Sequence, residues 1–188
     1  MPTPASTARR VPNDAVSRRG LPEPQQSRTR PVLATSIVVG VVALDLLTKV
    51  WAVRDLAGGP VDLIGDDIGF RLARNSGGAF SLFQGFTPLL AVVAGVVAYF
   101  LVRTVRRTAD TLLVVALSLV LGGALGNLID RVFRSPGFLR GAVVDFVHVG
   151  SFPTFNVADA SITIGAVLVV IWAIWGGDER ERAGYPGE

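Results

Sequence analysis

Four long apolar runs limit what this chain can fold into. They cover approximately residues 32–53, 87–102, 111–129 and 160–175, in a chain of 188 residues of which 50% are hydrophobic. A helix needs about 17–25 residues to cross a lipid bilayer, so the second and fourth runs are long enough only if their flanks join them. We therefore expect an all-α membrane protein with four transmembrane helices.

The arginines outside these runs predict how the chain is oriented. Residues 1–31 hold six arginines, the loop 103–110 holds three, and two more follow the fourth run. Because cytoplasmic loops carry an excess of Lys and Arg, both termini and the 103–110 loop are expected in the cytoplasm. The long connections 54–86 and 130–159 then face the other side of the membrane.

The same pattern divides the chain into three parts. Residues 1–31 are rich in Pro, Ser, Gln and Arg without apolar periodicity, which is typical of a disordered tail. We expect a membrane domain at 32–176 and a cytoplasmic C-terminal tail at 177–188. Within the first outer connection, residues 61–73 alternate partly around Gly65-Asp66-Asp67, which predicts a small extracytoplasmic β-hairpin on the membrane surface.

Missing residue types exclude several kinds of site. The chain has no Cys, which excludes disulfides, thiol nucleophiles and a lipid-modified Cys on this chain. His148 is the only histidine, so a His-rich metal site is excluded as well, whereas a Ser–His pair that uses His148 stays open. We expect neither a metal nor another cofactor.

Polar residues gather near the outer ends of the first and third runs. Lys49, the only lysine, follows Asp45 by four residues, a spacing that allows the two side chains to pair on a helix. Asn127, Asp130 and Arg131 share one helix face by the same rule. A buried or snorkelling ion pair and an ordinary polar helix end are the alternatives to a functional site.

Two further aspartates carry the strongest chemical signal. Asn156 is well placed to cap the fourth helix, and an acid at Asp159, the third helical position, is favoured by the helix dipole. Asp145 lies in the apolar segment VVDF and has no comparable structural role. Two carboxylates in a partly dry site share a proton, and such a pair can hydrolyse a peptide without a metal, Ser or Cys. Asp145 and Asp159 are the candidates for this pair; as a hypothesis the helix N-terminus favours Asp159 as the ionised member, although the proton belongs to the pair.

Five segments in chain order resemble one known family. They are DLLTK (45–49), NSGGAF (75–80), GGALGNLIDR (122–131), VVDF (143–146) and FNVAD (155–159). Over about residues 32–176 the chain is similar to lipoprotein signal peptidase, also called signal peptidase II. The resemblance implies a bacterial membrane aspartic endopeptidase. Such enzymes remove the signal peptide of prolipoproteins just before a Cys that carries diacylglyceryl.

The resemblance also implies roles for individual residues. The catalytic pair would be Asp145 and Asp159. The expected supporting or substrate-binding residues lie in or beside the matching segments: Asn127, Asp130, Arg131, Asn156, Asp45, Lys49, Asn75 and Gly77. The expected partners are lipid-modified prolipoproteins and membrane lipids, not nucleic acid, and the chain is expected to be a monomer. It would lie in the bacterial cell membrane with its active site at the extracytoplasmic face, beside a small β-element.

Two other functions compete with a peptidase. Intramembrane acids are common in transporters and proton relays, although here they gather at one level and no internal repeat is visible. A membrane scaffold would use the polar residues only to satisfy helix ends. The scaffold alternative predicts that Asp145→Asn is tolerated.

Overall fold

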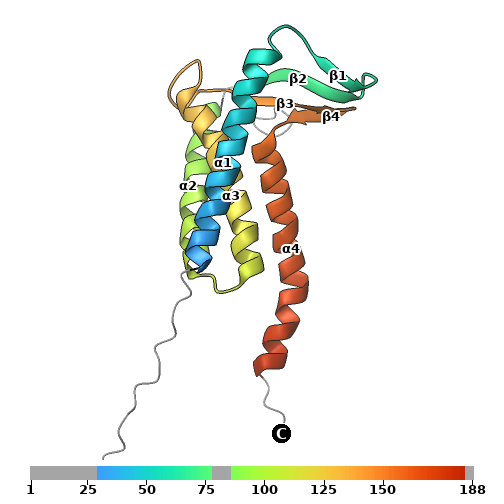
Figure 1. The fold of residues 1–188 in the computed structure, drawn as a ribbon. Coiled ribbons are helices and arrows are strands. Elements are labelled where there is room, and N and C mark those ends of the chain that lie inside the picture. The colour runs from blue at the N-terminus through green and yellow to red at the C-terminus, as the bar shows by residue number, and fades with distance from the viewer. Residues whose placement is uncertain (1–28, 78–85, 185–188) are drawn as a thin grey trace, which may run out of the picture.

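A computed structural model describes residues 29–77 and 86–184, the last nine of these by their backbone alone. The described residues form four long helices and one small sheet (Figure 1). The helices are α1 (Thr29–Asp55), α2 (Thr87–Arg107), α3 (Thr111–Phe133) and α4 (Val157–Gly184). All four contain stretches long and apolar enough to cross a membrane, which confirms the predicted four-helix membrane architecture.

The helix ends differ from the predicted boundaries in a consistent direction. Helix α1 begins three residues before the predicted domain start, and α4 continues through Gly184 into the segment expected to be a tail. Residues 1–28 of the predicted N-terminal tail lie outside the described residues. Flanking residues lengthen the second and fourth apolar runs, so that α2 spans 21 residues and the apolar part of α4 spans 19.

Local sequence explains where α2 and α3 begin. Helix α2 has a proline in its first turn, where the missing backbone N–H costs nothing. Asp110 caps α3, and its carboxylate accepts a hydrogen bond of 2.9 Å from the backbone N–H of Leu113. The short connection 108–110 therefore forces α2 and α3 to run antiparallel.

Helix α3 is the centre of the bundle and packs against each of the other three helices (Figure 1). Its glycines allow these close approaches. A Cβ added at Gly122 would lie 2.8 Å from Cβ of Val41 in α1, and one added at Gly123 would collide with the backbone carbonyl of Ala158 in α4. Small residues at such crossings let helix backbones meet in a membrane.

The sheet lies at one end of the bundle, here called the sheet end (Figure 1). Its strands are β1 (Val61–Ile64), β2 (Ile68–Asn75), β3 (Val143–Val149) and β4 (Phe152–Phe155), antiparallel in the order β1-β2-β3-β4. Strands β1 and β2 confirm the hairpin predicted over 61–73. The sequence did not predict β3 and β4, so the β-element is larger than expected.

Strand β3 connects the sheet to the helices. Val144 and Phe146 are buried in a core with Ala52 of α1, and Trp51 contacts Phe146 edge-on at 6.0 Å between ring centroids. Because side chains alternate along a strand, Asp145 points to the opposite face of the sheet from its two apolar neighbours. Burial of Val144 and Phe146 in the core thus directs the Asp145 side chain to the opposite face of the sheet.

The close α3–α4 crossing predicts a large effect of one methyl group. Gly123→Ala should lower the free energy of unfolding by roughly 1–3 kcal/mol, because the added Cβ meets backbone of α4 that cannot move alone. Gly95→Ala on α2 is the matched control, since its Cβ would meet nothing within 4 Å. Thermal unfolding of both variants in the same detergent measures the difference. Equal stability of the two variants would contradict the close contact.

Candidate active site

Asn156 and Asp159 cap each other at the start of α4. The backbone N–H of Asp159 donates to Oδ1 of Asn156 at 2.9 Å, and the backbone N–H of Asn156 donates to Oδ2 of Asp159 at 3.3 Å. This confirms the capping arrangement predicted from the sequence. Capping occupies one carboxylate oxygen of Asp159. The other accepts a hydrogen bond of 2.8 Å from Nδ2 of Asn127 on α3.

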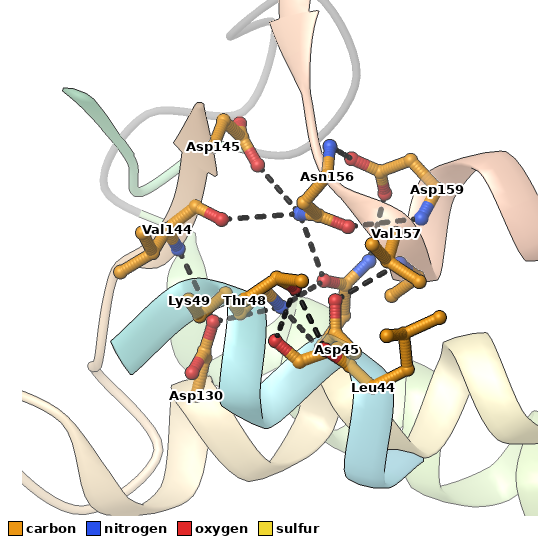
Figure 2. Close-up of polar contacts among 12 residues, drawn as sticks. Leu44, Asp45, Thr48, Lys49, Asp130, Val144, Asp145, Asn156, Val157 and Asp159 are labelled. Atoms are coloured by element: carbon orange, nitrogen blue, oxygen red, sulfur yellow. Dashed lines mark hydrogen bonds and ion pairs between the residues drawn. The ribbon is translucent and has the colours of Figure 1, made fainter. Parts of the chain in front are cut away.

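Asp145 reaches the same place from the sheet. Its Oδ1 accepts a hydrogen bond of 2.6 Å from Nδ2 of Asn156, and its Oδ2 accepts one of 3.2 Å from Nδ2 of Asn75 on β2. Asn156 therefore contacts both aspartates, and Figure 2 shows it between them. Asp145 is only 3% exposed. The structure thus brings the two predicted aspartates together around one amide side chain.

A buried cation lies beneath this pair. Nζ of Lys49 is 2.8 Å from Oδ2 of Asp45 and 2.9 Å from Oδ2 of Asp130 (Figure 2). It also donates a hydrogen bond of 3.0 Å to Oδ1 of Asn127. Because a lysine can only donate, it fixes the amide oxygen of Asn127 on its own side. The amide nitrogen of Asn127 is then directed at Asp159. The predicted Asp45–Lys49 pair is confirmed, and it is both buried and connected to the site.

Asp45 and Asp130 form an ion cluster with Lys49, and both also accept hydrogen bonds from the backbone. Oδ1 of Asp45 accepts from the N–H of Ala158 in the first turn of α4, at 2.9 Å. Oδ2 of Asp130 accepts from the N–H of Val144, next to Asp145, at 3.1 Å. Gly126 leaves the room for this, since a Cβ there would lie 2.5 Å from Oδ2 of Asp45. The ion cluster therefore positions the segments that carry both aspartates.

Both aspartates line one pocket of about 620 Å³. Asn75, Asn127 and Arg131 line its polar part. The remaining wall comes mainly from apolar residues of β4 and α4, which include Phe152, Pro153, Phe155, Ala160, Ile162 and Ile164. A volume of this size is typical of pockets that bind small ligands or side chains. The two carboxylates therefore face a space in which a substrate can meet them.

Burial and the neighbouring carboxylate change the acidity of Asp145. Burial raises the pKa of Asp145 from its ordinary value of 3.8 to about 6, and the charge of Asp159 adds to this increase. Hydrogen bonds from Asn75 and Asn156 and the charge of Lys49 act in the opposite direction without cancelling it. Two interacting carboxylates in a shielded site are expected to behave in this way.

The other predicted residues also join this network. Gly77 is buried, and its backbone N–H donates to Oδ1 of Asn75 at 3.0 Å, which leaves the amide nitrogen of Asn75 for Asp145. Arg131 is buried and donates to the backbone carbonyl of Asn127 at 3.3 Å. His148 is not among the residues that line the pocket. In the described part of the chain, no three His, Cys, Asp or Glu side chains gather as a metal site.

Two parts of the site were missed from the sequence. Arg134 pairs with Asp130 one helical turn away, and this i, i+4 spacing was a usable signal. The aromatic residues of β4 wall the pocket because β4 pairs with β3, which places Phe155 opposite Val147. The Gly150-Ser151 turn between these two short strands was a usable signal for a β-hairpin.

The comparison with protein families gives a direct match. Residues 37–175 match the family model described as signal peptidase (SPase) II. Relatives named lipoprotein signal peptidase include that of Mycolicibacterium smegmatis, which is 46% identical to this chain. The match covers 98% of this chain and 78% of the relative. The relative from Rhodococcus jostii is 49% identical, with 82% of this chain and 78% of the relative covered.

Solved structures agree with the fold. One bacterial membrane enzyme superposes with a TM-score of 0.70 at 30% identity, covering 84% of this chain and 94% of its own. A second gives a TM-score of 0.67 at 32% identity, covering 77% and 94%. Together with the four membrane-spanning helices and the family match, these similarities show that the chain is a multi-pass bacterial membrane protease that belongs to the signal peptidase II family.

Proposed function

We propose that this chain is an aspartic endopeptidase that removes signal peptides from diacylglyceryl-modified prolipoproteins, cutting just before the lipidated Cys. The observation that carries the proposal is the meeting of Asp145 and Asp159 in one pocket, from a strand and a helix far apart in sequence. Membership of the signal peptidase II family supports a prolipoprotein substrate.

The two carboxylates take different parts in the reaction. Below a pH of about 6, Asp145 holds a proton because burial and Asp159 raise its pKa, and it donates a hydrogen bond to the scissile carbonyl oxygen. Asp159, at the N-terminus of α4, acts as the base and takes a proton from the attacking water. When the tetrahedral intermediate collapses, that proton passes to the leaving nitrogen. The shared proton belongs to the pair as a unit.

Several neighbours act as positioning residues in this scheme. Asn127 holds one oxygen of Asp159 and is itself oriented by Lys49. Asn75 holds one oxygen of Asp145. Arg131 lines the pocket and brings donors that suit the backbone carbonyls of a bound peptide. These contacts hold both carboxylates in the relative geometry that proton transfer needs.

The position of the pocket supports a membrane-anchored substrate. It lies at the sheet end of the bundle, and its apolar wall on β4 and α4 suits the apolar segment of a signal peptide. Arg103, Arg106 and Arg107 lie toward the other end, where α2 meets α3 (Figure 1). The positive-inside rule assigns the end with the arginines to the cytoplasm. The site is thereby proposed at the extracytoplasmic surface, where the lipidated Cys can reach it without leaving the membrane.

Neutralising either aspartate should abolish cleavage. We expect Asp145→Asn and Asp159→Asn each to lower kcat by about a thousandfold or more, since both proton transfers need the pair. The assay uses purified protein with a diacylglyceryl-modified precursor and resolves the products by mass spectrometry. Asp62→Asn is a matched control because Asp62 is an exposed acid of β1, paired with Arg71 and outside the pocket.

Two outcomes of this assay would contradict separate parts of the proposal. Cleavage by Asp145→Asn at the wild-type rate would rule out the pair and favour a structural role for these acids. Equal cleavage of a precursor that lacks diacylglyceryl would leave the pair intact but exclude the lipid requirement. Thermal unfolding of each variant confirms that it is folded.

The acidity of Asp145 predicts how cleavage depends on pH. Because the pKa of Asp145 is raised to about 6, its proton is present below this pH and is lost above it. We expect kcat to fall as pH rises through about 6, by about tenfold per pH unit well above the pKa, as for the loss of one proton. Initial rates at saturating substrate between pH 5 and pH 8 measure this. A kcat that stays constant or rises over that range would contradict the assignment of Asp145 as the proton donor.

A further inference from the structure

A second pocket lies at the end of the bundle opposite the sheet. Its volume is about 540 Å³, and residues of α1, α2, α3 and the connection between α2 and α3 line it. Figure 1 shows that the beginning of α1 and this connection lie at the same end. The pocket shares no lining residue with the active-site pocket.

The pocket exists because two helices share a neighbour without closing on each other. Among the described residues, α1 and α2 both pack extensively on α3 but hardly touch each other. A groove is left between them, and Leu121 and Leu125 of α3 form part of its floor. Val38 of α1 and Val102 of α2 contribute to its apolar sides.

The groove is basic at one end and apolar along the rest. Arg30, Arg106 and Arg107 line it where α1 begins and α2 ends, and no Asp or Glu is among its lining residues. Val39 lies nine residues after Arg30, which is roughly 14 Å further along α1 at the rise of an α-helix. The groove therefore presents cationic groups at the membrane surface and an apolar channel below them.

We propose that this groove binds one phospholipid with an anionic headgroup. The lipid phosphate lies among Arg30, Arg106 and Arg107, because guanidinium groups bind phosphate with paired hydrogen bonds. One acyl chain lies in the apolar part between α1 and α2. In the proposed orientation this lipid belongs to the cytoplasmic leaflet, where basic pockets between transmembrane helices bind anionic headgroups.

Charge distinguishes this occupant from the segment that precedes α1 in the sequence. Residues 1–28 carry five arginines and two acids, so they have the same sign of charge as the arginines of the groove. A zwitterionic lipid has no net charge to pair with the arginines of the groove. An anionic phospholipid matches both the basic end and the apolar channel.

Lipid retention measured by native mass spectrometry tests this proposal on the full chain. The protein is mixed with equal amounts of phosphatidylglycerol and phosphatidylcholine that carry the same acyl chains. We expect one phosphatidylglycerol to be retained in preference. Arg106→Gln and Arg107→Gln should each weaken this binding by about fivefold, the effect expected for one surface arginine on an anionic lipid.

Two further variants distinguish a lipid in the groove from a general effect of charge and from binding of an anion alone. Arg103→Gln removes the same charge from the same helix but does not line the groove, so it should leave retention unchanged. Val38→Trp keeps all three arginines and fills the apolar channel, so it should abolish retention. Thermal unfolding shows whether each variant is folded.

Several results would overturn the proposal. One is equal retention of the two lipids, which would show a non-specific apolar contact. Another is an equal loss in Arg103→Gln and Arg106→Gln, which would show a general charge effect. Displacement of the lipid by glycerol 3-phosphate, together with normal retention in Val38→Trp, would show an anion site only. Because binding is measured without cleavage, these results do not depend on the proposed peptidase activity.

Discussion

The buried ammonium group of Lys49 is the interaction on which the rest of this site depends. It lies among Asp45, Asp130 and the amide oxygen of Asn127, and it is fully buried. A carboxylate buried between helices without a cation would be strongly destabilising, so Asp45 and Asp130 must both stay close to Lys49. Because Lys49 is on α1 and Asp130 is on α3, these ion pairs hold the two helices at a fixed separation. Asn127, which Lys49 orients, holds Asp159 by a hydrogen bond. Asp130 holds the backbone N–H of Val144, next to Asp145.

The two aspartates are held by different kinds of structure. Asp159 is fixed by reciprocal capping at the start of α4, whereas Asp145 is fixed by the alternation of side chains along β3. Asn156 contacts both, so the helix and the strand cannot shift independently. In the proposed mechanism, the raised pKa of Asp145 makes this residue the acid of the pair and leaves Asp159 to act as the base.

Local sequence patterns predicted the features that depend only on residues close together in the chain. Apolar runs predicted the helices, Gly65 predicted the hairpin turn, and the Asn156–Asp159 spacing predicted the cap. Strand β3 was missed because a short apolar segment becomes a strand only through pairing, here with β2, about 70 residues away; β4 pairs in turn with β3. The contacts of Asp145 with Asn75 and of Lys49 with Asp130 also join residues that lie far apart in sequence. The predicted topology placed Asp45, Asp130 and Asp145 at one level of the membrane, and the family resemblance then placed Asn75 with them in one site.

The pKa of Asp145 tests most directly whether Asp145 and Asp159 form one electrostatic unit. Infrared titration of the purified protein, with Asp145→Asn to assign the carboxyl band, measures this pKa. It should be about 6 in the wild-type protein and lower in Asp159→Asn, because the variant removes the neighbouring negative charge. A pKa of Asp145 that is unchanged by Asp159→Asn would contradict the account.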